Sequence, residues 1–448
     1  MGLPIKKESI TMQTINFDLS KKHGGFRPMN AVNNGPVHKR HANDQQRSNL
    51  KYFRAARIPY ARNHDASFNA GYGGEHSVDI SAIFPNFDAD PYKEESYDFA
   101  CTDEYIAVTL EAGTETFYRL GQKIEHYIKK FNVMPPKDFK KWAIVCEHII
   151  RHYNYGWANG YEYNIKYWEI WNEPDLDYQR DTIRTWGGTR EEFFDLYEIT
   201  AKHLKSCFPE LKIGGPALAW NMEWARVFLG EMQKREVPID FFSWHIYTNN
   251  VSDVLKRISI AREIMDECGY GDAESILNEW NYVLGWDAEK FPYSIKQIIG
   301  LKGAAFTLAV MSASQKSDKL DMLMYYDARP CAFNGLFDFY ILSPLKGYYP
   351  FLWYGKFYDM DAEIRSECDP DDIYTLCGVD KDGKIMATVT YYTDDDNADT
   401  KDIKLNFGKD GKYEVYYLDN SHDPSACEVV ESLEFKLERC VSILIKEI

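Results

Sequence analysis

Residues 163–174 read YNIKYWEIWNEP, and this stretch decides the fold class. Its first nine residues are rich in aromatic and isoleucine side chains, which predicts a buried strand at 163–171. Pro174 has no N–H to donate to a neighbouring strand, so pairing ends at this point. Apolar residues with helical spacing lie on both sides, over 137–153 and 191–208. A strand between two amphipathic helices is typical of an α/β fold with a parallel sheet.

The same alternation of strands and helices extends along most of the chain. We expect earlier strands at 26–33, 56–64 and 114–121, and later strands at 211–219, 237–247, 275–280 and 320–326. One further helix is expected at 293–312, and another is capped by Ser252 or Asp253 and ends at Gly269. Eight strands with intervening helices predict a closed (β/α)8 barrel, a TIM barrel, over residues 21–360.

The pattern changes near residue 360, where period-2 alternation replaces helical spacing. Ile403, Leu405 and Phe407 alternate in this way, and turn signals at 380–383 and 409–411 separate the runs. Residues 361–448 are therefore predicted to form an accessory all-β domain, a small sandwich. The short, alternating segment 1–20 is expected to add a strand to it.

Composition excludes several classes of function. A formal net charge of −17 argues against a nucleic-acid partner, because phosphate binding needs a basic surface. Nine cysteines without CxxC or other metal-ligand spacing predict reduced thiols and no metal site. The first 20 residues lack the apolar core of a signal peptide, and no run approaches 18 apolar residues, so we expect a cytoplasmic protein without a membrane partner.

Two acidic residues lie where barrel strands end. Glu173 follows the strand at 163–171, and Glu279 comes at the end of the strand at 275–280, three βα units later. The fourth and seventh strands face each other across a barrel, so these side chains are expected to converge at its C-terminal mouth. Either glutamate alone would more often be an ordinary loop carboxylate. The pair indicates glycoside hydrolysis, in which one carboxyl group protonates the leaving oxygen and the other attacks the sugar.

Four segments together resemble glycoside hydrolase family 39: WEIWNEP at 168–174, SWHIY at 243–247, NEWN at 278–281 and AFNGLF at 332–337. The resemblance covers most of residues 25–360. It implies a clan of barrel glycosidases that retain anomeric configuration, with Glu173 as acid/base and Glu279 as nucleophile. Members of the family typically hydrolyse β-xylosides, and another branch cleaves α-L-iduronides.

Further side chains are expected around the two carboxylates. Asn172 is predicted to hydrogen-bond the sugar 2-hydroxyl, although it also suits a turn before Pro174. His245 and Tyr247 resemble the family's His-x-Tyr, which implies that Tyr247 orients Glu279 and that His245 meets a sugar hydroxyl.

Arg62 and His64 resemble the family's Arg-x-His. Arg62 near Glu279 would lower the pKa of that carboxyl group, and a structural ion pair is the alternative for this arginine. A metal role for His64 and His245 is not supported, since no HxH or HExxH motif accompanies them. No cofactor is expected.

Substrate shape is expected to be set by loops. The candidates are the insertion at 69–98, the segment 186–188, and the residues Trp220, Trp280, Trp286, Phe333 and Asn334. Many clan members have a tryptophan at the end of strand eight as a platform for the sugar. Here residues 323–329 read LMYYDAR, so Tyr326 is predicted to replace it, and Asp327 and Arg329 to reach sugar hydroxyls or a carboxylate.

The sequence therefore predicts an exo-acting retaining glycosidase of β-xylosidase type that acts on a glycoside or oligosaccharide. Two alternatives remain open at this point. One is a retaining glycosidase of other specificity, for galactosides, glucosides, arabinopyranosides or uronides, or with endo action. The other is a non-catalytic carbohydrate-binding barrel. A homo-oligomer is possible in each case.

Overall fold

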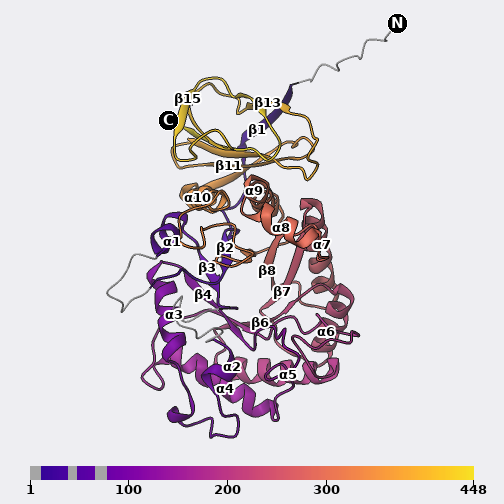
Figure 1. Cartoon of the computed structure of the whole chain (residues 1–448). Helices are drawn as coiled ribbons and strands as arrows, with labels where there is room; N and C mark the ends of the chain where they lie inside the picture. Colours follow the sequence, from indigo (N-terminus) through magenta and orange to yellow (C-terminus); the bar gives the residue numbers. More distant parts are fainter. Residues whose placement is uncertain (1–11, 39–47, 66–77) are drawn as a thin grey trace.

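The computed structural model describes residues 12–38, 48–65 and 78–448 of the chain. It has two parts, a barrel ringed by helices and a curled β-sheet that lies against one side of it (Figure 1).

The barrel consists of eight parallel strands that follow one another around the ring in chain order, as predicted. Alternate residues point inward, and a layer of apolar side chains, among them Phe117, Tyr167 and Phe241, fills the barrel interior. The strands are β2 (Ala31–Asn33), β3 (Tyr60–Arg62), β4 (Glu115–Leu120), β5 (Tyr167–Ile170), β6 (Lys212–Leu218), β7 (Phe241–Thr248), β8 (Glu274–Tyr282) and β9 (Met322–Tyr325).

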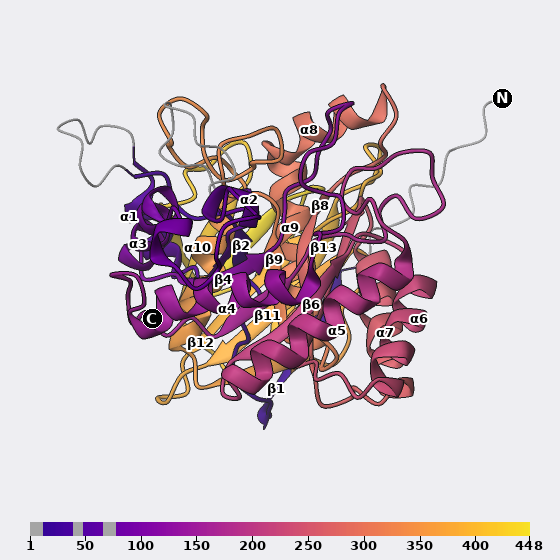
Figure 2. The same ribbon diagram turned by 90° about the horizontal axis from the view of Figure 1, so that it is seen from below.

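Helices cover the outside of the barrel, and Figure 2 shows α4 and α5 side by side on it. Thr189 and Glu192 form a reciprocal capping box at the start of α5, and Gly156 ends α4 in the left-handed conformation. The helices are α1 (Leu50–Ala56), α2 (Ile80–Ile83), α3 (Ala100–Glu111), α4 (Phe139–Tyr155), α5 (Arg190–Cys207), α6 (Met222–Lys234), α7 (Val251–Glu267), α8 (Lys290–Ile298), α9 (Leu301–Lys316) and α10 (Tyr348–Lys356), with 3-10 turns at Glu94–Ser96 and Phe357–Asp359.

The first two strands are shorter than predicted. Strand β2 begins at Ala31 rather than 26, because Pro28 has no N–H to donate and Arg27 bonds to carbonyl groups beyond α9. Strand β3 begins at Tyr60 rather than 56, because residues 50–56 are helical and bury Phe53 and Ala56 with helical spacing.

Two helix predictions also need correction. Helix α7 is capped by Asn250, whose side chain accepts from the Ser252 N–H, so neither Ser252 nor Asp253 is its cap. The helix expected at 293–312 is two helices, α8 and α9, which meet at an angle of 78° around Gly300. Apolar residues continue with helical spacing across this break, so the sequence pattern did not reveal it.

The accessory domain is a mixed nine-stranded sheet in the order β15-β14-β17-β12-β11-β10-β1-β13-β16. Strand β1 (Gln13–Lys22), from the start of the chain, pairs antiparallel with β10 and parallel with β13. Ile15 of β1, Leu405 of β13 and Ile443 of β17 share one apolar core, so the sheet curls over like a sandwich. Its other strands are β10 (Ala362–Ser366), β11 (Ile373–Val379), β12 (Ile385–Tyr391), β13 (Lys401–Asn406), β14 (Tyr413–Leu418), β15 (Cys427–Val430), β16 (Glu434–Leu437) and β17 (Ser442–Glu447).

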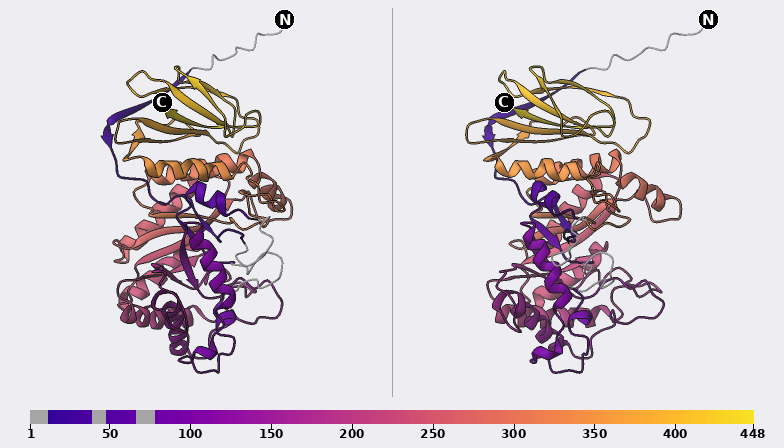
Figure 3. Two further views of the ribbon diagram at one scale, coloured as in Figure 1. Left: turned by 90° about the vertical axis from the view of Figure 1, so that its left-hand side faces the viewer. Right: turned by 60° about the vertical axis from the view of Figure 1, so that its left-hand side comes forward.

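Helix α9 joins the two parts. The orange helices beneath the yellow sheet in Figure 3 lie between it and the barrel, and α9 is buried along most of its length. Lys302 of α9 forms ion pairs with Asp394 at 3.1 Å and Asp396 at 2.9 Å in the sheet domain. Among the described residues no single helix has the length and apolarity to cross a membrane; the bent α8–α9 pair meets those two criteria together.

Candidate active site

Glu173 reaches the barrel mouth through a sharp turn after β5. Strand pairing stops at Ile170, and Trp171 (φ 72°) and Glu173 (φ 50°) both adopt the left-handed conformation, which side chains other than glycine seldom take. The turn is held by the Glu173 N–H on the Ala217 carbonyl (2.9 Å) and the Thr185 hydroxyl on the Glu173 carbonyl (2.6 Å). The carboxyl group is almost fully buried.

A β-bulge at Asn278 directs Glu279 into the barrel. In the register of β7 with β8, Trp244 pairs with Leu277 but His245 pairs with Glu279, so Asn278 is the extra residue. Asn278 and Glu279 therefore both point inward although they are adjacent. The Asn278 amide donates to Glu169 at 2.5 Å, and the Tyr247 hydroxyl donates to Glu279 at 2.5 Å.

The two predicted carboxylates converge at His245. Its Nδ1 lies 2.9 Å from Oε1 of Glu173 and 3.7 Å from Oε2 of Glu279. One oxygen of each carboxylate and a nitrogen of the histidine all lie within 4.8 Å of one another. The expectation that His245 meets a sugar hydroxyl applies to its other nitrogen, Nε2, which is buried without a hydrogen-bond partner among the described residues.

The surroundings give the two carboxyl groups different pKa values. Burial, and next the charge of Asp175, raise the pKa of Glu173 to about 8. Burial raises the pKa of Glu279 to about 7, because it outweighs the lowering by His245, by Arg62 and by the Tyr247 hydrogen bond. Burial also lowers the pKa of His245 to about 4, which keeps the imidazole neutral.

Arg62 organises the floor of the site. Its buried guanidinium donates to Glu169 (2.7 Å), to Glu279 (3.3 Å) and to the side-chain oxygen Oδ1 of Asn172 (2.6 Å). Because Arg62 fixes the amide of Asn172, the Nδ2 group of that residue has a defined direction, and it is buried without a partner among the described residues. It is available to donate to a ligand. Arg62 thus combines both sequence hypotheses, since it pairs with Glu279 and belongs to a structural ion pair.

Replacement of Glu169 by glutamine tests the contribution of the buried Arg62–Glu169 ion pair to stability. We expect Glu169→Gln to destabilise the fold by about 3–5 kcal/mol, because it leaves the buried Arg62 charge with one carboxylate fewer. The measurement is the free energy of unfolding by denaturant titration. Glu267→Gln is the matched control, since its ion pair with Arg226 is exposed and should contribute less than about 1 kcal/mol. Equal losses in both variants would contradict this role for Glu169.

Aromatic side chains form the wall next to Glu279. The ring centroid of Phe333 lies 5.4 Å from that of Tyr326 and 5.8 Å from that of Tyr247. The Tyr326 hydroxyl donates to Asp65 at 2.7 Å. His64 is buried with its ring centroid 6.4 Å from that of Tyr326. The structure therefore brings Arg62, His64, Asn172, His245, Tyr247, Tyr326 and Phe333 together with the carboxylates.

Trp280 and Asn334, predicted to bind substrate, are placed differently. Trp280 follows Glu279 in the strand and so points outward, where it packs against Tyr325 and against Phe306 of α9. The amide of Asn334 bonds to the backbone of Leu336 and Phe337, so it shapes its own loop. Asp327 and Arg329 are likewise engaged with each other and with neighbouring loops.

The loops at the mouth present further aromatic rings. Trp286 is 62% exposed and lies 5.3 Å from Tyr247 between ring centroids, whereas Trp220 is 44% exposed beneath the guanidinium of Arg180. Trp186 is buried against Trp171. Of the insertion at 69–98, residues 69–77, including the glycines at 71–74, lie outside the described residues.

The sequence prediction missed several residues that support the site. They are Asn33 and Glu169, which fix Arg62; Asn278 and Ser243, which fix Glu169; and Asp65 and Asp175. An acidic residue inside an apolar strand, as in the WEIW run, is a signal that identifies Glu169, since burial of a charge requires a partner.

A closed (β/α)8 barrel with two buried glutamates converging at its C-terminal mouth has the architecture of the barrel glycoside hydrolases. Residues 58–276 match the sequence profile of glycosyl hydrolases family 39. The matched segment runs from just before β3 into β8 and makes up slightly less than half of the chain.

Two curated relatives are named beta-xylosidases. The protein from Geobacillus stearothermophilus is 33% identical over 170 residues, which are 36% of this chain and 31% of that protein. The protein from Caldicellulosiruptor saccharolyticus is 33% identical over 186 residues, 39% of this chain and 35% of that protein. The matched segment thus spans about a third of the length of these relatives.

Solved structures share the whole fold at low sequence identity. A glucosidase from Croceicoccus marinus has a TM-score of 0.78 at 22% identity, with 98% of this chain and 99% of that chain covered. A monomeric beta-xylosidase from Caulobacter crescentus has a TM-score of 0.67 at 14% identity, with 97% and 99% covered. The barrel and the accessory domain thus occur together in known proteins.

Proposed function

We propose that the chain is a retaining glycosidase in which Glu279 is the nucleophile and Glu173 the acid/base. The carrying observation is the separation of the two carboxylates, whose oxygens approach within 4.8 Å. Retaining enzymes hold this pair about 5–5.5 Å apart, whereas inverting enzymes leave about 6.5–9.5 Å to admit a water molecule. The spacing here suits direct attack on the sugar.

The reaction has two steps. In the first, Glu279 attacks the anomeric carbon, the bond to the leaving oxygen breaks, and Glu173 gives its proton to that oxygen. In the second, Glu173 takes a proton from water, which attacks the same carbon and releases Glu279. Each step inverts the anomeric centre, so the product keeps the configuration of the substrate.

The contacts of each carboxyl group support this division of roles. Glu279 accepts from Arg62 and Tyr247, both of which favour its ionised form. Glu173 has the higher pKa, and no arginine among the described residues bonds to its oxygens, which favours its protonated form. Neutral His245 lies between the two carboxyl groups and helps to hold them in place.

For the sugar, we propose a β-xyloside, because the two curated relatives, 33% identical over 170 and 186 residues of this chain, are named beta-xylosidases. A panel of aryl glycosides tests this, with kcat/KM measured for β-xyloside, β-glucoside, β-galactoside, α-L-arabinopyranoside and α-L-iduronide. The β-xyloside is expected to be the best substrate. A tenfold higher kcat/KM for another sugar would contradict the proposed substrate. It would leave the proposed retaining mechanism unchanged.

The pH profile follows from the two pKa values. Turnover needs ionised Glu279 and protonated Glu173, so kcat/KM should rise as the pH increases through about 7 and fall through about 8. Tyr247→Phe removes a hydrogen bond that lowers the pKa of Glu279, so its acidic limb should move to higher pH. An acidic limb at the ordinary carboxyl value of 4.5 would contradict the burial argument.

Trp286 is proposed to stack on the substrate outside the catalytic pocket, because its exposed ring adjoins Tyr247. Trp286→Ala is expected to raise KM for a xylo-oligosaccharide about 3- to 10-fold with little change in kcat. Tyr92→Ala is the control, since Tyr92 is similarly exposed but packs against His148 of α4. An unchanged KM in Trp286→Ala would exclude this contact.

A further inference from the structure

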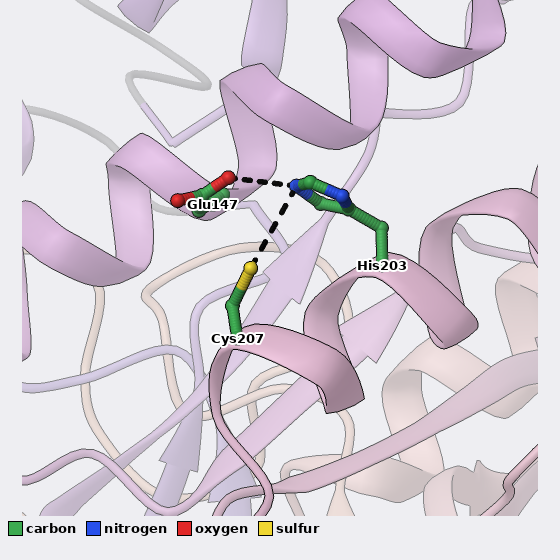
Figure 4. A group of neighbouring side chains, drawn as sticks. All are labelled: Glu147, His203 and Cys207. Carbon is green, nitrogen blue, oxygen red and sulfur yellow. Dashed lines mark hydrogen bonds and ion pairs between the residues drawn. The ribbon is translucent and has the colours of Figure 1, made fainter.

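A second cluster of titratable side chains lies outside the barrel, between helices α4 and α5. Figure 4 shows Glu147 of α4 pointing towards His203 and Cys207 of α5. Nε2 of His203 lies 2.7 Å from Oε2 of Glu147 and 4.0 Å from Sγ of Cys207. One ligand atom from each residue lies within 4.8 Å of the other two.

We propose that Glu147, His203 and Cys207 form a zinc site that links α4 to α5. His203 and Cys207 are one helical turn apart and share a face of α5, so both can reach one ion. Glu147 supplies the third ligand from the neighbouring helix. The sequence prediction found no metal site because this set combines a four-residue spacing in α5 with a residue distant in the chain.

The chemical nature of the three ligand atoms determines which metal ion the site would bind. Imidazole nitrogen, thiolate sulfur and carboxylate oxygen are the ligands that Zn²⁺ takes, whereas Mg²⁺ and Ca²⁺ require oxygen ligands alone. Three protein ligands leave a fourth tetrahedral position for water. His203 is 31% exposed along its side chain, so solvent and an ion can enter from the surface.

The geometry requires only small movements. Tetrahedral zinc with ordinary bond lengths separates nitrogen from oxygen by about 3.4 Å and nitrogen from sulfur by about 3.6 Å. The nitrogen–oxygen distance must therefore increase from 2.7 Å, and the nitrogen–sulfur distance must decrease from 4.0 Å. Rotation of the side chains supplies both shifts, each of which is less than about 1 Å.

Arg151 prepares the carboxylate for this role. Its Nε donates to Oε1 of Glu147 at 2.6 Å, and this contact leaves Oε2 directed at His203. A hydrogen bond to the non-ligating oxygen is the usual support of a metal-binding carboxylate.

The position of the cluster indicates a stabilising ion. Cys207 is the last residue of α5, and the chain then enters the first residues of β6. The cluster therefore lies towards the N-terminal ends of the strands, away from the mouth that holds Glu173 and Glu279. Ions and contacts at this face affect stability rather than chemistry.

The test uses the full chain after treatment with a chelator, with Co²⁺ and Zn²⁺ as probes. One equivalent of Co²⁺ is expected to give a thiolate-to-cobalt charge-transfer band, and Zn²⁺ should displace it and raise Tm. Cys207→Ser should abolish the band, and both Cys207→Ser and His203→Ala should weaken Zn²⁺ binding about 100-fold or more. Cys368→Ser, which removes an exposed thiol, is the matched control and should keep the band.

The described residues contain one other set of three potential ligands, Glu173, His245 and Glu279, and it has no sulfur. Glu279→Gln should therefore keep the cobalt band and the zinc affinity. Absence of the band in the unsubstituted protein, or its persistence in Cys207→Ser, would overturn the proposal. Zinc binding that is unchanged in Cys207→Ser but lost in Glu279→Gln would overturn it as well, because the ion would then lie at the carboxylate pair.

Discussion

Glu279→Gly is expected to lower kcat/KM for an aryl β-xyloside by about 10⁴-fold or more, because it removes the group that forms the covalent intermediate. Glu279 is the inward carboxylate at the bulge of β8, within hydrogen-bonding reach of both Arg62 and Tyr247. Glu173 and Glu279 are the two carboxylates that converge at His245. The loss should therefore be the same for good and poor leaving groups, since attack on the anomeric carbon precedes every product.

The space left by the side chain provides a sharper measurement. Azide added to Glu279→Gly can attack the anomeric carbon from the vacated side while Glu173 still protonates the leaving oxygen. A β-xyloside should then yield an α-xylosyl azide, because a single displacement inverts the centre. NMR of the product gives its configuration directly. Formation of a β-azide would show that Glu279 is not the nucleophile.

The loss must be separated from a folding defect, because Glu279 contacts the buried guanidinium of Arg62. Glu279→Gln keeps the shape of the side chain, and Arg62 keeps its closer ion pair with Glu169 (2.7 Å, against 3.3 Å to Glu279). This variant should therefore lose less stability than Glu169→Gln, fold, and yet remain inactive. Asp287→Ala, which removes an exposed acidic residue from the loop after β8, should keep the activity of the unsubstituted protein. If Glu279→Gln turned over substrate at the normal rate, the proposed mechanism would be wrong.

The strands and the two carboxylates could be predicted from the sequence because their signals are local. A buried strand of about five residues needs a run of apolar side chains, and Pro174 marks where one such run leaves the sheet. The errors fall where a local signal is ambiguous. The strand predicted at 56–64 starts four residues too early, because Ala56 is the last residue of helix α1 and β3 begins at Tyr60.

The interior of the site could not be predicted in the same way, because long-range contacts decide it. A regular strand places Asn278 and Glu279 on opposite faces, and only the register with β7 shows the bulge that turns both inward. The partners of Arg62 come from β2, β5 and β8 and from the turn after β5, which no spacing in the chain reveals. The outward direction of Trp280 follows from strand alternation once Glu279 is placed inward.

The same contacts explain why the site holds two carboxylates of unlike character. Arg62 lies against Glu279 and reaches Asn172 but not the oxygens of Glu173. Asp175, which accepts three backbone N–H groups after β6, adds negative charge beside Glu173 instead. Removal of Glu173 should therefore produce kinetics that differ in kind from those of Glu279→Gly.

Glu173→Ala is expected to lower kcat/KM by about 10²- to 10⁴-fold for substrates whose leaving group needs a proton. For a dinitrophenyl β-xyloside, whose leaving group is a stable anion, formation of the covalent intermediate should be nearly unaffected. Its hydrolysis should be slow, because no base activates water. Rapid mixing should then show a burst of released phenolate followed by a low steady rate, and the alkaline limb of the pH profile should disappear.

The configuration of the azide product distinguishes Glu173→Ala from Glu279→Gly. In Glu173→Ala it should attack the covalent intermediate from the side that water normally uses, and the product should be the β-xylosyl azide, with retained configuration. Glu173→Gln is the second variant, because it preserves contacts with His245 and guards against a folding defect. Equal rate losses for the dinitrophenyl and alkyl glycosides would contradict the assignment, because a residue that donates a proton must matter most where the leaving group cannot depart as an anion.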